Sequence, residues 1–257
     1  MKSNLIIGKN SFVGKSLSKS KKGIYISYKD IDDIDFKDFK NIYLLSSPKN
    51  YRKKKELNFS FEKKVLNKLS NQKLIFFSTS KIYPNKINCS EDLNPSPQNF
   101  YAENKLKVEK LFTKEYEKSI ILRFSNIFDV KTLNKKNFLG LLNSNYFDKG
   151  KIIFDINLKS KKDFISIKSI KKILKKIENN LNNGIYNIGS QTGYTIYKII
   201  KFYFGEKIMK LTPVNQKQKI VSQTLSIKKI NKLLKLSKYN FHYETKNQLL
   251  ICKKYFS

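Results

Sequence analysis

The sequence predicts an α/β fold whose centre is a doubly wound parallel sheet. Short apolar runs of strand length, at 4–7, 24–28 and 41–47, alternate with segments whose apolar residues follow helical spacing. The first run ends in a turn bounded by Gly8 and Gly14, which leads into the first helical segment. Strands that alternate with helices in this way are typical of a parallel sheet covered by helices.

The rest of the first half continues this alternation. Residues 56–69 have helical spacing, and the apolar run at 73–80, "KLIFFSTS", predicts another buried strand. Three of the five prolines fall within 84–98, which predicts a loop. A helix is expected from Tyr101 onward, and "SIILRFSNIF" at 119–128 is expected to form one further strand.

The second half is mixed. Helical patterns are found at 137–147, 169–181, 195–204, 226–236 and 246–256, and a short strand is expected at 184–190. No long linker or internal repeat separates the halves, so we expect two closely joined lobes. We expect residues 1–128 to form the sheet domain with 163–190 returning to it, and residues 129–162 and 191–257 to form a smaller lobe.

The net charge of +33 has two explanations. A partner rich in phosphate, such as nucleic acid, would be attracted by it. Codon bias explains it as well, because only Arg52 and Arg123 among the 53 basic residues are arginines and the lysines are spread along the chain. We favour codon bias, so nucleic acid is not the expected partner.

Several classes of protein are disfavoured by composition. The two cysteines are not in a C-x-x-C pair and His242 is the one histidine, which argues against a metal site, a disulfide framework and histidine-based catalysis. The chain has no uninterrupted apolar stretch long enough to span a membrane, and its N-terminal apolar run is too short for a secretory signal. A cytoplasmic protein is therefore expected.

The first turn, "GKNSFVG", has features of a dinucleotide site. Glycines allow a tight turn and let a pyrophosphate approach the helix N-terminus, where N–H groups and the helix dipole favour an anion. Ser11 occupies the middle glycine position, where its hydroxyl could donate to a phosphate oxygen. At the end of the second strand, Ser27 and Lys29 favour NADP and Asp30 favours NAD, so the choice of cofactor stays open.

Tyr101 and Lys105 form a Tyr-x-x-x-Lys pair on a predicted helix. A lysine ammonium beside a phenol would lower the phenol pKa and let it act as an acid or base. The spacing alone has little weight, because six tyrosines in this chain have a lysine four residues later. The place of Tyr101 distinguishes it: the helix follows a strand that ends in Ser78, Thr79 and Ser80, and active groups lie at the carboxyl ends of such strands.

Seven segments in order resemble the extended short-chain dehydrogenases/reductases, in particular the NAD(P)-dependent nucleotide-sugar epimerase/dehydratase group. The segments are "LIIGKNSFVGKSL", "NIYLLSS", "LIFFSTSKIYP", "FYAENKLKVEKLF", "ILRFSNIF", "KKDFISIKSI" and "GIYNIGSQTGYTI". The resemblance implies a Rossmann-like fold with a small, trimmed C-terminal substrate lobe.

The resemblance also implies residue roles. Tyr101 would be the acid/base, Lys105 would lower its pKa and hold the nicotinamide ribose, and Thr79 would orient the substrate oxygen. Asn126 would contact the phosphates of the substrate, and hydride would pass between the nicotinamide and a sugar carbon, with C4 expected. The implied cofactor-binding residues are Gly8, Asn10, Ser11, Phe12, Val13, Gly14, Tyr28, Lys29, Ser46, Tyr101 and Lys105. The implied substrate-binding residues are Thr79, Ser80, Arg123, Asn126 and Lys162.

The chain also departs from the family pattern. Lys162 stands where the family usually has arginine, and Ser80 and Lys81 stand where 4,6-dehydratases have an Asp-Glu pair. The expected activity is therefore that of an NAD(P)-dependent epimerase or reductase of a nucleotide sugar in surface polysaccharide synthesis, and not a 4,6-dehydratase. The alternative is a non-catalytic Rossmann-fold protein that binds nucleic acid or another polyanion. Homodimerisation is left open.

Overall fold

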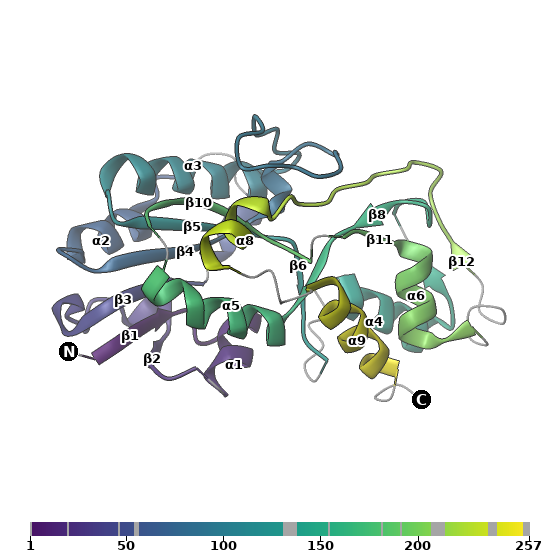
Figure 1. Cartoon of the computed structure of the whole chain (residues 1–257), viewed down its shortest axis with the longest axis horizontal. Coiled ribbons are helices and arrows are strands. Elements are labelled where there is room, and N and C mark those ends of the chain that lie inside the picture. The colour runs from purple at the N-terminus through teal and green to yellow at the C-terminus, as the bar shows by residue number, and fades with distance from the viewer. Residues whose placement is uncertain are drawn as a thin grey trace. The chain divides into compact units, whose positions relative to one another are not determined.

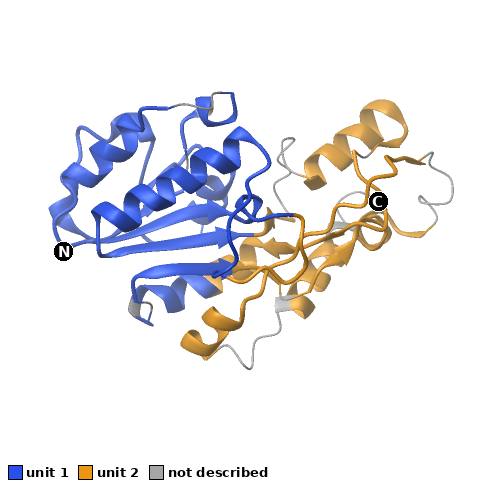
Figure 2. Ribbon diagram, turned by 90° about the horizontal axis from the view of Figure 1, so that it is seen from above, with its two compact units in different colours: residues 1–84, 91–124, 173–187 blue, residues 85–90, 125–172, 188–257 orange. Residues whose placement is uncertain are grey.

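A computed structural model describes residues 2–19, 21–45, 47–53, 57–130, 138–153, 155–180, 182–190, 192–206, 214–235 and 241–253. The chain divides into two compact units (Figure 2). Unit 1 comprises residues 1–84, 91–124 and 173–187, and unit 2 comprises 85–90, 125–172 and 188–257. Within the described ranges, no helix is both long and apolar enough to cross a membrane.

Unit 1 is built around a six-stranded sheet with the order β10-β5-β4-β3-β1-β2 (Figure 1). Its strands are β1 (Lys2–Ile7), β2 (Ile24–Ile26), β3 (Phe39–Leu44), β4 (Lys73–Thr79), β5 (Ser119–Phe124) and β10 (Gly184–Ile188). The pairs β1–β2, β1–β3, β3–β4 and β4–β5 are parallel. The chain passes from β1 to β2 on one side and then to β3 on the other, so the topological switch point lies at β1 and β3. The predicted doubly wound α/β fold is confirmed.

Helices cover both faces of this sheet. The longer ones are α1 (Phe12–Ser18), α2 (Ser60–Lys68), α3 (Phe100–Glu115) and α5 (Ile167–Asn180), and single turns are formed by η1 (Tyr28–Asp30), η2 (Phe36–Asp38), η3 (Lys49–Arg52) and η4 (Ser80–Ile82). Helices α2 and α3 lie over one face and α1 over the other (Figure 1). The strands are apolar on both sides, as a doubly covered parallel sheet requires, and Leu5, Ile42 and Leu74 are fully buried in the core cluster.

Unit 2 contains short strands and helices around its own core. Its strands are β6 (Asn126–Phe128), β7 (Ile152–Ile153), β8 (Lys161–Lys162), β9 (Phe164–Ser166), β11 (Tyr194–Thr195) and β12 (Val214–Asn215), and its helices are α4 (Phe138–Lys149), α6 (Ile196–Phe204), α8 (Lys228–Leu234) and α9 (Phe241–Lys253). The core cluster includes Phe128, Phe164, Ile199 and Leu249.

One sequence-based expectation was wrong in detail. Residues 119–128 do not form a single strand, because β5 ends at Phe124 and β6 starts at Asn126 in a different sheet. The break follows from hydrogen bonding: the Ser125 N–H donates to Ile188 O at 2.9 Å, and the Asn126 N–H donates to Asp163 O at 3.1 Å. Strand β6 then pairs in parallel with β9.

Candidate active site

The first turn of unit 1 requires glycine at both of its ends. Gly8 has a φ of 119°, in the region that side chains disfavour. A Cβ at Gly14 would lie 2.2 Å from the Gly8 carbonyl oxygen, closer than any real contact. The turn after β1 can therefore pack this closely against α1 only because both residues lack side chains.

Ser11 closes this turn as the N-cap of α1. Its Oγ accepts from the Gly14 N–H at 3.0 Å and donates to the Gly8 carbonyl oxygen at 2.7 Å. The expected donation from Ser11 to a phosphate is not supported, because its single proton is already used by Gly8. The serine takes the place of the middle glycine as a structural cap.

The start of α1 is suited to an anion. The first N–H groups of a helix lack intrahelical partners, and Ser11 satisfies only that of Gly14. The N–H groups of Phe12 and Val13 have no hydrogen-bond partner in the described part of the chain. These N–H groups, next to Gly8 with no side chain in the way, are suited to binding a phosphate group. Asn10, in the same turn, is exposed.

The turn after β2 is held by its own capping box. The Asp30 carboxylate accepts from the Ser27 N–H at 3.1 Å, and the Ser27 hydroxyl accepts from the Lys29 N–H at 3.3 Å. Tyr28 packs edge-on against Phe61, with ring centroids 5.9 Å apart, and Lys29 is exposed. The Asp30 carboxylate, which would bind the ribose of NAD, already accepts a hydrogen bond within this turn. The geometry of the turn therefore does not distinguish NAD from NADP. Ser46 lies outside the described residues.

Thr79 ends β4 and begins the turn η4. Its Oγ1 accepts from the Lys81 N–H at 3.3 Å, which fixes the hydroxyl oxygen. Thr79 is 9% exposed, so only a small part of it is open to a substrate. The neighbouring Ser80 is buried at the same end of β4.

Helix α3 places Tyr101 and Lys105 in unit 1 with Thr79. Asn99 caps the helix by accepting from the Ala102 N–H at 3.0 Å. The Lys105 ammonium donates to the Phe77 carbonyl oxygen at 2.7 Å and lies 4.3 Å from the Phe76 ring centroid. This bond connects the middle of α3 to β4 two residues before Thr79.

The electrostatics of Tyr101 and Lys105 differ from the prediction. Burial lowers the pKa of the Lys105 ammonium to about 7, while the carboxylates of Glu62 and Glu109 oppose that shift. Burial raises the pKa of the Tyr101 phenol, and the Arg52 guanidinium partly offsets it. The direction for Tyr101 is opposite to the predicted one, because burial of the phenol raises its pKa by more than the Arg52 guanidinium lowers it. The Lys105 ammonium, which was expected to lower this pKa, donates instead to the Phe77 carbonyl oxygen.

Arg123 belongs to a buried polar network that includes Ser78, the residue before Thr79. Its Nη2 and Nε donate to Glu109 Oε2 at 2.7 and 3.0 Å, and its Nη1 donates to the Tyr83 hydroxyl at 2.7 Å. Ser78 donates to the same Glu109 carboxylate. Arg123 is 3% exposed, so this geometry favours a structural role over the predicted substrate-binding one.

The remaining predicted residues belong to unit 2. Asn126 donates from its side-chain nitrogen to the Asp163 carbonyl oxygen at 2.8 Å. The buried Asp163 carboxylate in turn accepts from the Ser190 N–H and hydroxyl at 2.9 and 2.8 Å. Lys162 is half-buried and lies on β8, which pairs with β11. Asn126 is thus oriented by the residue that follows Lys162.

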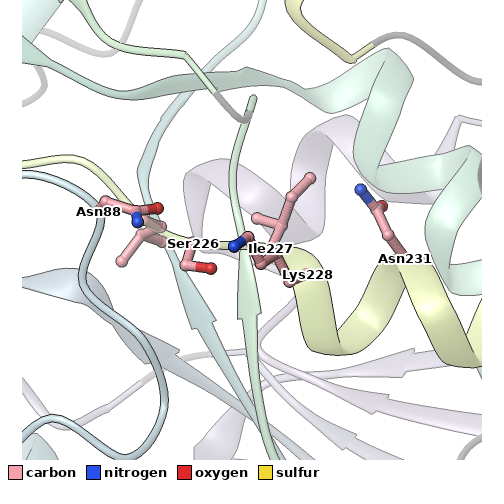
Figure 3. Close-up of a pocket in the computed structure, with 6 residues that line it drawn as sticks. Asn88, Ser226, Ile227, Lys228 and Asn231 are labelled. Atoms are coloured by element: carbon pink, nitrogen blue, oxygen red, sulfur yellow. The ribbon is translucent and has the colours of Figure 1, made fainter.

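Unit 2 also has a pocket of about 280 Å³ that contains none of the predicted site residues. It is lined by Asn88, Leu225, Ser226, Ile227, Lys228 and Asn231 (Figure 3). The buried Oδ1 of Asn231 has no hydrogen-bond partner among the described residues.

Sequence reasoning missed three charged residues around α3. Glu62 and Glu109 are each 1% exposed, and nothing in their sequence context separates them from surface glutamates. Arg52 is different: its guanidinium carbon lies 5.4 Å from the centroid of the Tyr101 ring. Its rarity was a usable signal, because the chain has only one other arginine, Arg123, which also contacts α3.

Ala102→Leu is expected to destabilise the protein by about 1–3 kcal/mol, because Ala102 is fully buried and a larger side chain must displace its neighbours. The midpoint of urea unfolding measures this cost. Lys110→Leu, at an exposed position of the same helix, is the matched control and should change stability by less than about 0.5 kcal/mol. Equal effects of the two substitutions would contradict tight packing at Ala102.

The chain matches one known family model and several solved structures over most of its length. The sequence profile described as the RmlD substrate binding domain matches residues 49–226. A comparison with curated protein sequences finds no match.

Three solved structures illustrate the structural similarity. TunA, an NAD-dependent NDP-hexosamine 5,6-dehydratase involved in tunicamycin biosynthesis, aligns with a TM-score of 0.80 and 17% identity over 100% of this chain and 99% of that chain. The UDP-glucuronic acid 4-epimerase from Bacillus cereus in complex with NAD aligns with a TM-score of 0.74 and 20% identity, over 96% and 99%. RMD from Pseudomonas aeruginosa, complexed with NADPH, aligns with a TM-score of 0.77 and 14% identity, over 99% and 98%.

Proposed function

Since the chain belongs to the RmlD substrate binding domain family, within the extended short-chain dehydrogenases/reductases, we propose that it is an NAD(P)-dependent enzyme that modifies a nucleotide sugar. The relatives in solved structures include epimerases and a dehydratase that bind NAD or act with it, and one structure contains NADPH. More specifically, we propose that the enzyme is an epimerase or a reductase, and the support for this choice comes from the residues of this chain.

The observation that carries the proposal is the bond from Lys105 to Phe77. It connects the helix of Tyr101 to the strand that ends in Thr79, at 2.7 Å. An ammonium group has further N–H donors beyond the one used by Phe77, and these could bind the hydroxyls of a ribose. Tyr101 would exchange a proton with a sugar hydroxyl, and Thr79 would hold the oxygen of that hydroxyl.

The turn after β1 is the proposed cofactor site. The nicotinamide cofactor, when bound, accepts or donates the hydride. Gly8 offers close approach, and the N–H groups of Phe12 and Val13 would bind its pyrophosphate. Asn10, Gly14, Tyr28, Lys29 and Ser46 are retained as proposed neighbours of the cofactor, and Ser11 is retained as the cap that shapes the turn.

The substrate proposal uses residues of unit 2 and the end of β4. Asn126 and Lys162 are proposed to contact the phosphates of a nucleotide sugar. The two residues after Thr79 are Ser80 and Lys81, so the carboxylates that a 4,6-dehydratase uses there are missing. This supports an epimerase or reductase over a 4,6-dehydratase.

A thermal-shift panel tests the proposal. NAD or NADP, and one class among UDP-, GDP- and dTDP-sugars, should raise the melting temperature, because a ligand that binds only the folded state stabilises it by about 2.7 kcal/mol at 100 times its Kd. Inorganic triphosphate is the control for non-specific anion binding to a chain of net charge +33. No shift with either cofactor, or an equal shift with triphosphate, would contradict the proposed function.

A further inference from the structure

The chain uses arginine only where it contacts helix α3. All but two of its 53 basic residues are lysines, and the exceptions are Arg52 and Arg123. Arg123 binds Glu109 of α3, and the Arg52 guanidinium carbon lies 5.4 Å from the ring centroid of Tyr101 on the same helix. Arg52 opens the run "RKKK", so the arginine of that run is the residue placed over Tyr101.

Arginine suits this contact better than lysine does. A guanidinium is planar, stays charged at any relevant pH and stacks on aromatic faces, whereas an ammonium is a strongly hydrated point charge. In a chain that has lysine at nearly every other basic position, the arginine over the Tyr101 ring favours a specific role for the guanidinium.

The other charges near Tyr101 act elsewhere. Lys105, one turn along α3, donates to the Phe77 carbonyl oxygen. Glu62 on α2 interacts with Tyr51 and Lys105. Of these groups, only Arg52 has a resolved effect on the Tyr101 phenol, where its charge partly offsets the burial that raises the pKa.

We propose that Arg52 is a positioning residue for Tyr101: its guanidinium holds the ring from the side of η3 and stabilises the phenolate form that the reaction uses. The proposal rests on the proposed function for the catalytic use of Tyr101, and on the contact alone for the electrostatic effect. In this enzyme the cation that assists the tyrosine comes from the segment after β3, and Lys105 is left to bind the strand and the ribose.

The first test needs no substrate. The protein is labelled with ¹³Cζ-tyrosine, the Tyr101 signal is identified with Tyr101→Phe, and its chemical shift is followed from pH 7 to 11. In Arg52→Gln the titration of Tyr101 should move to higher pH, and in Arg52→Lys it should move less. Lys53→Gln removes an equal charge from the next residue, which is also exposed, and should leave the titration unchanged. An unchanged titration in Arg52→Gln, or an equal shift in Lys53→Gln, would overturn the proposal.

The second test uses the pH dependence of turnover, with the cofactor and nucleotide sugar that give the largest thermal shifts. Arg52→Gln should lower kcat/KM about two- to fivefold at pH 7, the size of an exposed cation–π contact, and should move the ascending limb of the pH profile to higher pH. Arg52→Lys should restore part of the loss. A uniform loss at every pH would mean a purely structural role and would also overturn the proposal. If no nucleotide sugar is turned over, the proposed function fails, and the tyrosine titration still decides whether Arg52 acts on Tyr101.

Discussion

Tyr101→Phe is expected to keep the fold and cofactor binding while turnover falls by about 100- to 10,000-fold, the usual contribution of a general acid or base. The substitution removes only the phenol oxygen, which forms no hydrogen bond to any other residue that the structure describes. The ring would keep its place beneath Arg52. Turnover is measured by the change in nicotinamide absorbance, or by product analysis if the cofactor is regenerated within one cycle.

The matched control is Tyr197→Phe. Tyr197 also has a lysine four residues later, but it belongs to α6 in unit 2 and is 47% exposed. This variant should keep wild-type turnover, because a Tyr-x-x-x-Lys pair that lies outside the sheet domain is not expected to take part in catalysis. Near-full activity of Tyr101→Phe, with cofactor binding intact, would refute the assigned role.

Arg123→Met is expected to destabilise the protein by about 3–5 kcal/mol, because it leaves the Glu109 carboxylate buried without its partner. The side chains of Arg123 and Glu109 are 4% and 2% exposed, so water cannot replace the lost contact. The Tyr83 hydroxyl loses its donor as well. Urea unfolding followed by circular dichroism measures the change.

Lys64→Met is the control for Arg123→Met. Lys64 forms an ion pair with Asp32 in the same unit, at 2.8 Å, but both side chains are about half exposed or more, at 47% and 61%. An exposed pair contributes about 0–1 kcal/mol, so its loss should have little effect. If Arg123→Met lowered the free energy of unfolding no more than Lys64→Met does, the network of Arg123, Glu109 and Tyr83 would not stabilise the fold.

The fold could be predicted because local patterns determine it. The apolar runs that became β1, β3 and β4 are buried on both faces, and this gives them a signal that no surface segment imitates. The break between β5 and β6 could not be predicted, because it depends on Asp163, which is distant in sequence and supplies the carbonyl oxygen for Asn126. The spacing of apolar residues along the chain does not reveal hydrogen-bond partners that are distant in sequence.

The sequence predicted which residues are candidates for the site better than it predicted their interactions and pKa values. Tyr101, Lys105 and Thr79 were found from order along the chain, and they remain proposals for catalysis. The predicted direction of the Tyr101 pKa was wrong because helical spacing does not show the burial that raises the pKa of this phenol. Spacing also does not show the Phe77 carbonyl oxygen that binds the Lys105 ammonium. Arg123 was placed at the substrate for a similar reason, since a sequence does not show that Glu109 is its partner.

Positions 11 and 14 of the turn after β1 differ in whether they can hold a side chain. The chain has only nine glycines, and serine stands at position 11, where the resemblance described above implies glycine. That replacement is tolerated because the new hydroxyl forms both of its hydrogen bonds within the turn. At position 14 a Cβ would overlap the Gly8 carbonyl oxygen, so any side chain there would force the turn apart.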